Sequence, residues 1–80
     1  MTDLNLSGIR RLAKKGGAER ISREALEYLL YVTERIVIAI AKASNENARA
    51  RNKVTVEKSD VISALSDILK NPNKILKKET

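Results

Sequence analysis

Cysteine and histidine are absent from the 80 residues of this chain, and tyrosine, present twice, is its only aromatic residue type. Without thiols or imidazoles there is no disulfide, no thiol nucleophile, no histidine general base and no ligand set for a structural zinc ion. The scarcity of aromatic rings argues against a binder of single-stranded nucleic acid, since such proteins stack bases on aromatic side chains. We therefore predict that the chain is not an enzyme and has no metal, no cofactor and no small-molecule substrate.

Long apolar runs are missing as well. The apolar stretch 36–41 is six residues long, whereas a membrane-spanning helix needs about 20. The N-terminus, Met-Thr-Asp-Leu-Asn, has neither the basic flank nor the apolar core of a signal peptide. We expect a cytoplasmic protein without a membrane partner.

Helical periodicity dominates the sequence and predicts an all-α fold in which a long central helix lies between two shorter ones. The first helix is expected to begin at the capping residue Ser7 and to end at the glycine pair 16–17. The central helix is expected to begin at the cap Ser22 and to run without glycine or proline to about Ala48.

The third helix follows a short β-prone stretch, 54–56, and is expected to run from about Glu57 to Lys70, where Pro72 stops it. We divide the chain into an N-terminal tail (1–6), one folded domain (7–70) and a short basic C-terminal extension (71–80). Six apolar residues of the third helix are predicted to face inward: Val61, Ile62, Ala64, Leu65, Ile68 and Leu69.

The central helix is apolar over more than the stripe of about 100° that a helix with one buried face shows. A chain of this size has too little other structure to cover it, so we predict that two copies pair through it. Tyr28 and Tyr31 are expected at this interface or in helix packing. The predicted dimer core consists of Leu26, Leu29, Leu30, Ile36, Val37 and Ile40.

The net charge of +6 is concentrated at the two ends of the chain. Residues 1–22 carry a net +3, residues 23–48 a net −1 and residues 49–80 a net +4. Four cations, Arg10, Arg11, Lys14 and Lys15, lie within two turns of the first helix and repel one another unless an anion lies opposite. This distribution indicates a dimer core with a polyanion-binding rim.

Three sequence motifs resemble those of histones. The segment 8–22, GIRRLAKKGGAERIS, is similar to the first helix and first loop of the arginine-rich eukaryotic core histone, and its GAERIS part to the same loop of archaeal histones. Ser22, the triplet Lys53-Val54-Thr55 and Asp60 stand at the histone spacings without insertion or deletion. The resemblance extends from Gly8 to about Leu65.

This resemblance implies a histone fold in which two chains pair head to tail in a handshake, with each first loop beside the second loop of the partner. It implies that Arg20 enters a minor groove, that Arg10 and Arg11 approach phosphates, and that Thr55 donates a hydrogen bond to a phosphate. The expected DNA-binding residues are Arg10, Arg11, Lys14, Lys15, Arg20, Lys53 and Thr55.

Two departures from the family pattern affect the second loop. Histones pair the counterpart of Asp60 with an arginine, and Lys53 stands at that position here, so a looser Lys53–Asp60 pair is expected to orient the loop. Val54 replaces a frequent basic residue, which lowers the phosphate contact expected of this loop. The cations that could offset the loss are Arg49, Arg51 and Lys58.

Other departures affect assembly. Archaeal histones that wrap DNA join dimers through a leucine and a histidine late in the long helix and a leucine in the third helix, and the corresponding residues here are Asn47, Ala50 and Ser63. Small or polar groups there predict a weak contact between dimers. We expect a dimer that bends or bridges DNA, or a tetramer joined through another surface. Ile75 and Leu76 are candidates for an added contact, and the alternative, which we favour, is that they pack against the third helix.

The sequence thus predicts a nucleoid-associated prokaryotic protein that compacts, bends or bridges double-stranded DNA largely without sequence specificity, as a homodimer or tetramer. The alternative is a histone-fold subunit of a transcription or replication complex, which pairs with a histone-fold paralogue. Grouping of Arg10, Arg11, Lys14, Lys15 and Arg20 favours the DNA-binding hypothesis, because a module that only pairs has no need of these cations.

Overall fold

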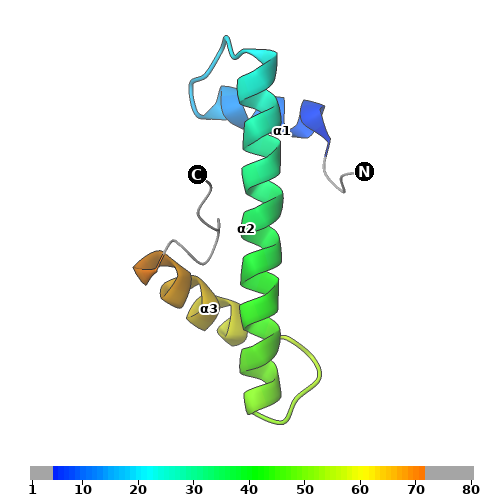
Figure 1. The fold of residues 1–80 in the computed structure, drawn as a ribbon, viewed down its shortest axis with the longest axis vertical. Helices are drawn as coiled ribbons and strands as arrows, with labels where there is room; N and C mark the ends of the chain where they lie inside the picture. Colours follow the sequence, from blue (N-terminus) through cyan, green and yellow to red (C-terminus); the bar gives the residue numbers. More distant parts are fainter. Residues whose placement is uncertain (1–4, 72–80) are drawn as a thin grey trace. The chain divides into compact units, whose positions relative to one another are not determined.

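The computed structural model describes residues 5–71, which form three helices and, within that range, no strand. Helix α1 spans Leu6–Lys15, α2 spans Arg23–Ala50 and α3 spans Lys58–Lys70 (Figure 1). The all-α prediction is confirmed, and the β-prone stretch 54–56 is irregular. The C-terminal extension, with Ile75 and Leu76, lies outside the described residues apart from Asn71.

The chain divides into two compact units, Met1–Glu34 and Arg35–Thr80, and α2 runs through both. In the first unit α1 packs against the N-terminal part of α2. Their core is a cluster of Ile9, Leu26 and Leu30, with Leu6 and Ile21 packed against its edge. Because Leu26 and Leu30 lie one turn apart, they present a single apolar stripe to the short helix.

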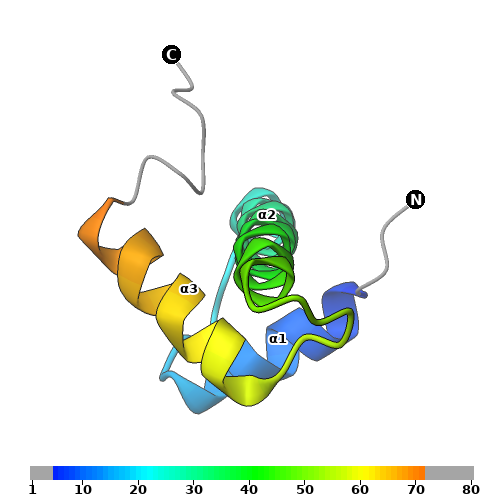
Figure 2. The same ribbon diagram turned by 90° about the horizontal axis from the view of Figure 1, so that it is seen from below.

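In the second unit α3 packs against one side of the C-terminal part of α2 (Figure 2). The buried face of α3 consists of Asp60, Ala64 and Ile68, which are spaced four residues apart. On α2 the buried residues are Ser44 and Ala48. Small side chains at these positions let the two backbones approach closely, and the Ser44 hydroxyl donates to the Ile40 carbonyl at 2.6 Å, so its burial leaves no polar group unpaired.

The N-terminal cap of α2 was predicted correctly from the sequence, and that of α1 was not. Ser22 caps α2 as predicted, its hydroxyl accepting a hydrogen bond from the Ala25 amide at 3.1 Å. The predicted cap Ser7 is wrong, because Asn5 caps α1 by accepting from the Gly8 amide at 2.7 Å. Both residues are good caps, and Asn5 starts the helix earlier and satisfies an amide that would otherwise lack a partner.

Helices α1 and α2 end in the same hydrogen-bonded turn. After α1, the Ala18 amide donates to the Ala13 carbonyl and the Gly17 amide to the Lys14 carbonyl, with Gly17 at φ +97°. After α2, which ends two residues later than predicted, the Lys53 amide donates to Ala48 and the Asn52 amide to Arg49, with Asn52 at φ +61°. Both are Schellman turns, which place glycine or asparagine in the left-handed conformation.

Much apolar surface stays exposed in the single chain. Among the described residues twelve large hydrophobic side chains are exposed, against six buried hydrophobic residues. On α3 the predicted inward set is only partly buried: Ala64 and Ile68 are covered, whereas Val61, Ile62, Leu65 and Leu69 are exposed. The prediction failed for these four because α2 covers only one face of α3.

The Schellman turn after α1 yields a stability prediction. We expect Gly17→Ala to destabilise the protein by about 1–2 kcal/mol, because a Cβ is disfavoured at positive φ. Gly16→Ala is the matched control, since Gly16 has φ −87° and an added Cβ there lies 3.4 Å from the Ala13 carbonyl oxygen. Thermal unfolding followed by circular dichroism measures both, and equal melting temperatures for the two variants would contradict the prediction.

Candidate nucleic-acid interface

Four cations project from the polar face of α1. Arg10, Arg11, Lys14 and Lys15 are all exposed, and the first turn of the helix holds no acidic residue. Lys14 and Lys15 lie in the last turn, where the helix dipole favours positive charge. Between residues 5 and 71 the ion pairs are Arg23–Glu27 and Arg51–Asp60, so all four cations keep their charge available for an external anion.

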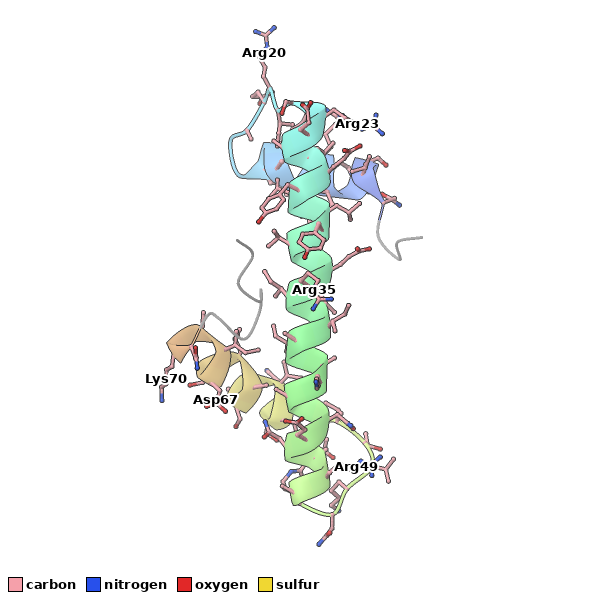
Figure 3. All side chains as sticks on the ribbon, viewed as in Figure 1. Arg20, Arg23, Arg35, Arg49, Asp67 and Lys70 are labelled. Atoms are coloured by element: carbon pink, nitrogen blue, oxygen red, sulfur yellow. The ribbon has the colours of Figure 1, made fainter. Side chains whose placement is uncertain are left out.

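The loop between α1 and α2 presents Arg20. Its side chain is exposed and extends away from the start of α2 (Figure 3). The loop leaves α1 through the Schellman turn at Gly17, and the Glu19 amide donates to the Gly17 carbonyl at 3.0 Å. Arg20 belongs to the same compact unit as the four α1 cations, so this unit carries five exposed basic side chains.

The loop between α2 and α3 presents Lys53 and Thr55. Both are exposed, and Val54 between them is the most exposed of the large hydrophobic residues at 84%. A valine with so little contact in its own chain contributes little packing energy there. Lys53 and Thr55 belong to the second unit, together with Asp60.

Asp60 fixes the second loop at its base. Its side chain is only 3% exposed. Arg51 donates from Nε to Oδ1 at 3.1 Å and from Nη2 to Oδ2 at 2.7 Å, and the Glu57 amide donates to Oδ2 at 2.9 Å. Asn47 adds a fourth bond, from its side-chain amide to the Asp60 carbonyl at 3.1 Å. The first turn of α3 is thereby tied to the last turns of α2.

The predicted Lys53–Asp60 pair is therefore corrected to Arg51–Asp60. The guanidinium of Arg51 supplies two parallel donors, so the pair is a bidentate fork and not the looser single contact that a lysine would give. Three basic residues, Arg49, Arg51 and Lys53, are close enough in sequence to reach Asp60, and spacing alone does not select among them. The structural role of Asn47 was missed entirely, because a side-chain to backbone bond across 13 residues leaves no sequence signal.

The Arg51 guanidinium, followed by the Glu57 amide, lowers the pKa of Asp60 below its ordinary value. Both groups bind the charged form of the carboxylate, and their effect exceeds that of burial, which acts in the opposite direction. The same contact raises the pKa of Arg51. Asp60 is thus held ionised, and its carboxylate is a fixed hydrogen-bond acceptor for Arg51 and the Glu57 amide.

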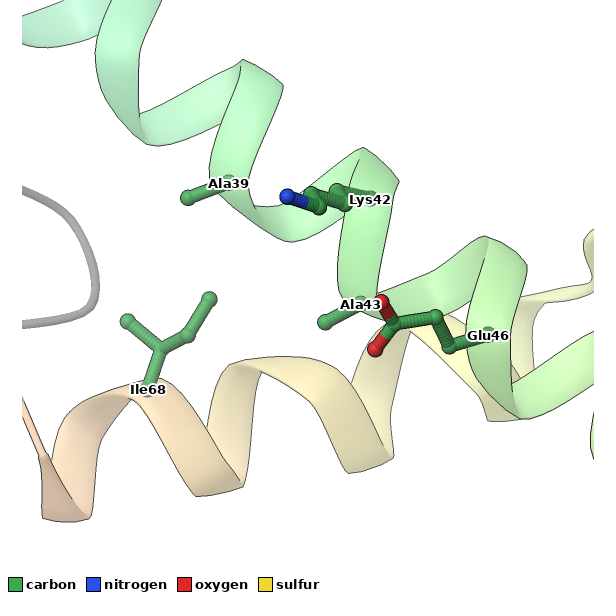
Figure 4. A pocket seen from close by; sticks show the side chains of 5 residues that line it. All are labelled: Ala39, Lys42, Ala43, Glu46 and Ile68. Carbon is green, nitrogen blue, oxygen red and sulfur yellow. The ribbon is translucent and has the colours of Figure 1, made fainter.

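Two hollows in the second unit are lined mainly by apolar side chains. One, of about 260 Å³, is lined by Ala39, Lys42, Ala43, Glu46 and Ile68 (Figure 4). The other, of about 350 Å³, is almost wholly apolar and is lined by Val37, Ile40, Ala41, Ser44, Val56 and Val61. Residues 5–71 contain no cluster of three potential metal ligands. None of the described helices is sufficiently long and apolar to span a bilayer.

The predicted dimer-core residues differ in exposure in the single chain. Leu26 and Leu30 are buried against α1 in their own chain. Ile36 and Ile40 are partly buried, whereas Leu29 and Val37 are 40% and 57% exposed. Tyr28 and Tyr31 are exposed as well, with their ring centroids 5.9 Å apart. The exposed members are the ones that remain available to a second chain.

Comparison with known proteins places these features in a family context. The family model described as "Histone-like transcription factor (CBF/NF-Y) and archaeal histone" matches residues 2–65. One of the subunits of archaeal histone HAN1 from Thermococcus zilligii is 38% identical over 61 residues, which cover 76% of this chain and 91% of the relative. Probable archaeal histone 3 of Methanocaldococcus jannaschii is 35% identical over 65 residues, which cover 81% of this chain and 97% of the relative. No solved structure matches.

The lowered pKa of Asp60 predicts how stability changes in acid. A carboxylate whose pKa is lower in the folded than in the unfolded state stabilises the fold above the unfolded value, near pH 4, and loses that contribution as the pH falls through the folded value. We expect Asp60→Asn to lower the melting temperature at pH 7, and the gap to the unsubstituted protein to narrow as the pH falls below the unfolded value near 4.

Asp67→Asn is the control for this measurement, because Asp67 is an exposed carboxylate on the same helix. Its melting temperature should follow that of the unsubstituted protein at each pH. A gap for Asp60→Asn that stays constant from pH 7 to about pH 3 would mean that the ionised carboxylate is not what stabilises the fold.

Proposed function

The chain belongs to the family of histone-like transcription factors and archaeal histones, and on this basis we propose that it is a DNA-binding histone of a prokaryotic chromosome. Both relatives are histones by name, and neither they nor the family bear the name of an enzyme. The protein binds double-stranded DNA and compacts, bends or bridges it.

One observation carries this proposal: five exposed cations of the first unit are gathered on α1 and its following loop, outside the ion pairs of residues 5–71. Mutual repulsion among these cations destabilises the folded chain, and phosphates that neutralise the cations remove this repulsion. Affinity then comes mainly from release of counterions and is strongly dependent on salt. Because phosphates carry no sequence information, binding is largely independent of sequence.

Pairing of two chains completes the proposal. The exposed side chains of Leu29 and Val37 and the apolar hollow of about 350 Å³ supply the surface that a second copy covers. Contiguous exposed apolar patches mark interaction sites in soluble proteins. In a head-to-tail pair the loop that holds Arg20 lies beside the loop that holds Lys53 of the partner, which forms a basic site at each end of the dimer.

End-to-end stacking of dimers is weak in this proposal. The side-chain oxygens of Asp60 accept three hydrogen bonds within their own chain, and Asn47 spends its amide on the Asp60 carbonyl. The Asp60 carboxylate is then not free for a neighbouring dimer, and Asn47, Ala50 and Ser63 offer it little apolar area. We therefore favour a dimer that bends or bridges DNA, or a tetramer built on another surface, over a continuous superhelix.

The role of Arg20 is tested by salt titration of duplex affinity. Arg20→Ala should weaken binding about tenfold at low salt and flatten the dependence of log affinity on log salt, because each dimer loses two cationic contacts. Arg35→Ala is the control of equal charge, since Arg35 lies in the middle of α2 (Figure 3). If Arg20→Ala binds as tightly as the control, Arg20 does not contact DNA.

The pairing proposal is tested by solution mass. Light scattering should give twice the 8.9 kDa of one chain or a multiple of that. Val37→Glu should shift the protein toward monomer or unfolding, because a carboxylate in an apolar interface is costly. Val54→Glu, at the 84% exposed loop position, should leave the mass unchanged. A stably folded monomer of the unsubstituted chain would overturn the proposal, and a dimer without duplex affinity would favour the alternative of a pairing subunit.

A further inference from the structure

The side chain of Asp60 is buried and accepts three hydrogen bonds from within the chain. Oδ1 accepts from Arg51, Oδ2 accepts from Arg51 and from the Glu57 amide, and the side chain is 3% exposed. A further cation would have to enter a space that is already occupied. Lys53, although it is nearer in sequence, therefore has no place on this carboxylate.

Arg51 and Asn47 both act on the start of α3. Asn47 lies near the end of α2, and Arg51 is the first residue after that helix. Arg51 holds the side chain of Asp60, and Asn47 holds its carbonyl at 3.1 Å. These two anchors fix the first turn of α3, and hence the end of the loop 51–57 that leads into it.

Lys53 is free in consequence. It is exposed, and neither ion pair of the described chain includes it. Its backbone is fixed, because its amide donates to the Ala48 carbonyl at 2.9 Å immediately after the left-handed residue Asn52. A flexible ammonium on a fixed backbone suits a single phosphate oxygen, whereas the guanidinium fork of Arg51 matches the carboxylate that it binds.

We propose that Arg51, together with Asn47, is the positioning residue of the second loop, and that this arrangement releases Lys53 to contact a DNA phosphate. Arg51 itself makes no DNA contact. The two cations of the loop thus have different roles: Arg51 binds the Asp60 carboxylate, and Lys53 contacts the DNA. This inference rests on the proposed function, since it assigns roles within the same DNA-binding surface.

The experiment measures the affinity of the full-length chain for a short fluorescent duplex across a series of salt concentrations. The slope of log affinity against log salt counts phosphate contacts, at about 0.9 per contact on duplex DNA. Lys53→Ala should therefore reduce the slope by about two for a dimer. Arg51→Lys keeps the charge but loses the fork, and it should weaken binding about threefold to tenfold at every salt concentration with an unchanged slope.

A second pair of variants guards against loss of folding. Arg51→Ala leaves the buried Asp60 carboxylate without its partner, so the double variant Arg51→Gln with Asp60→Asn is measured beside it, in which both charges are removed. The double variant, in which no carboxylate is left to attract Lys53, should keep the slope of the unsubstituted protein at a temperature where circular dichroism shows it folded, whereas Arg51→Ala leaves Asp60 open to Lys53 and should lower the slope. Amide exchange at Glu57, whose N–H bonds to Asp60, should be faster in both, which reports directly on the released loop.

Two results would overturn the inference while leaving the proposed function intact. A double variant, Arg51→Gln with Asp60→Asn, that reduces the salt slope as much as Lys53→Ala would make Arg51 a phosphate contact. Arg51→Lys that binds like the unsubstituted protein would show that the fork does not position the loop. The proposed function fails separately, if the unsubstituted chain has no salt-dependent affinity for the duplex or if neither Arg20→Ala nor Lys53→Ala weakens it.

Discussion

The structure depends on one constraint: the short helices cover too little of α2. In each compact unit a helix of 10 or 13 residues packs on one side of a helix of 28. The buried hydrophobic residues number six, fewer than the twelve large ones left exposed in the described part of the chain. Burial of apolar area is the main favourable term in folding, so a chain that leaves this much in water is marginal on its own. In the proposed dimer the second chain covers part of this surface and leaves the cations on the outside.

The sequence was sufficient for features that depend on periodicity and local backbone chemistry. The three helices, the Ser22 cap and the stop before Pro72 follow from residue types within a few positions of each boundary. The α1 cap was predicted wrongly because Asn5 and Ser7 are both good acceptors two residues apart, and the choice between them depends on which amide each can reach. The exposure of Leu65 and Leu69 depends on how much of α3 its neighbour covers, which a pattern does not contain.

The candidate site was likewise predicted in part from the sequence. The exposed cations of α1 and Arg20 were predicted from composition, spacing and resemblance, and the structure leaves all five exposed. The partner of Asp60 was predicted wrongly, because the family spacing indicated Lys53 while the side chain that reaches the carboxylate belongs to Arg51. Long-range side-chain pairs depend on rotamers and on the direction of a turn. Those are properties of the folded chain, and sequence spacing only limits the candidates.

The two Schellman turns have a thermodynamic consequence for ligand association. Gly17 and Asn52 end their helices with two backbone hydrogen bonds each, three residues before Arg20 and one residue before Lys53. The main chain carrying each cation is thus ordered when the protein folds, and only the side-chain torsions remain to be restricted on contact with a polyanion. Association should accordingly proceed with a small loss of conformational entropy, so that the gain from displaced counterions is retained almost in full.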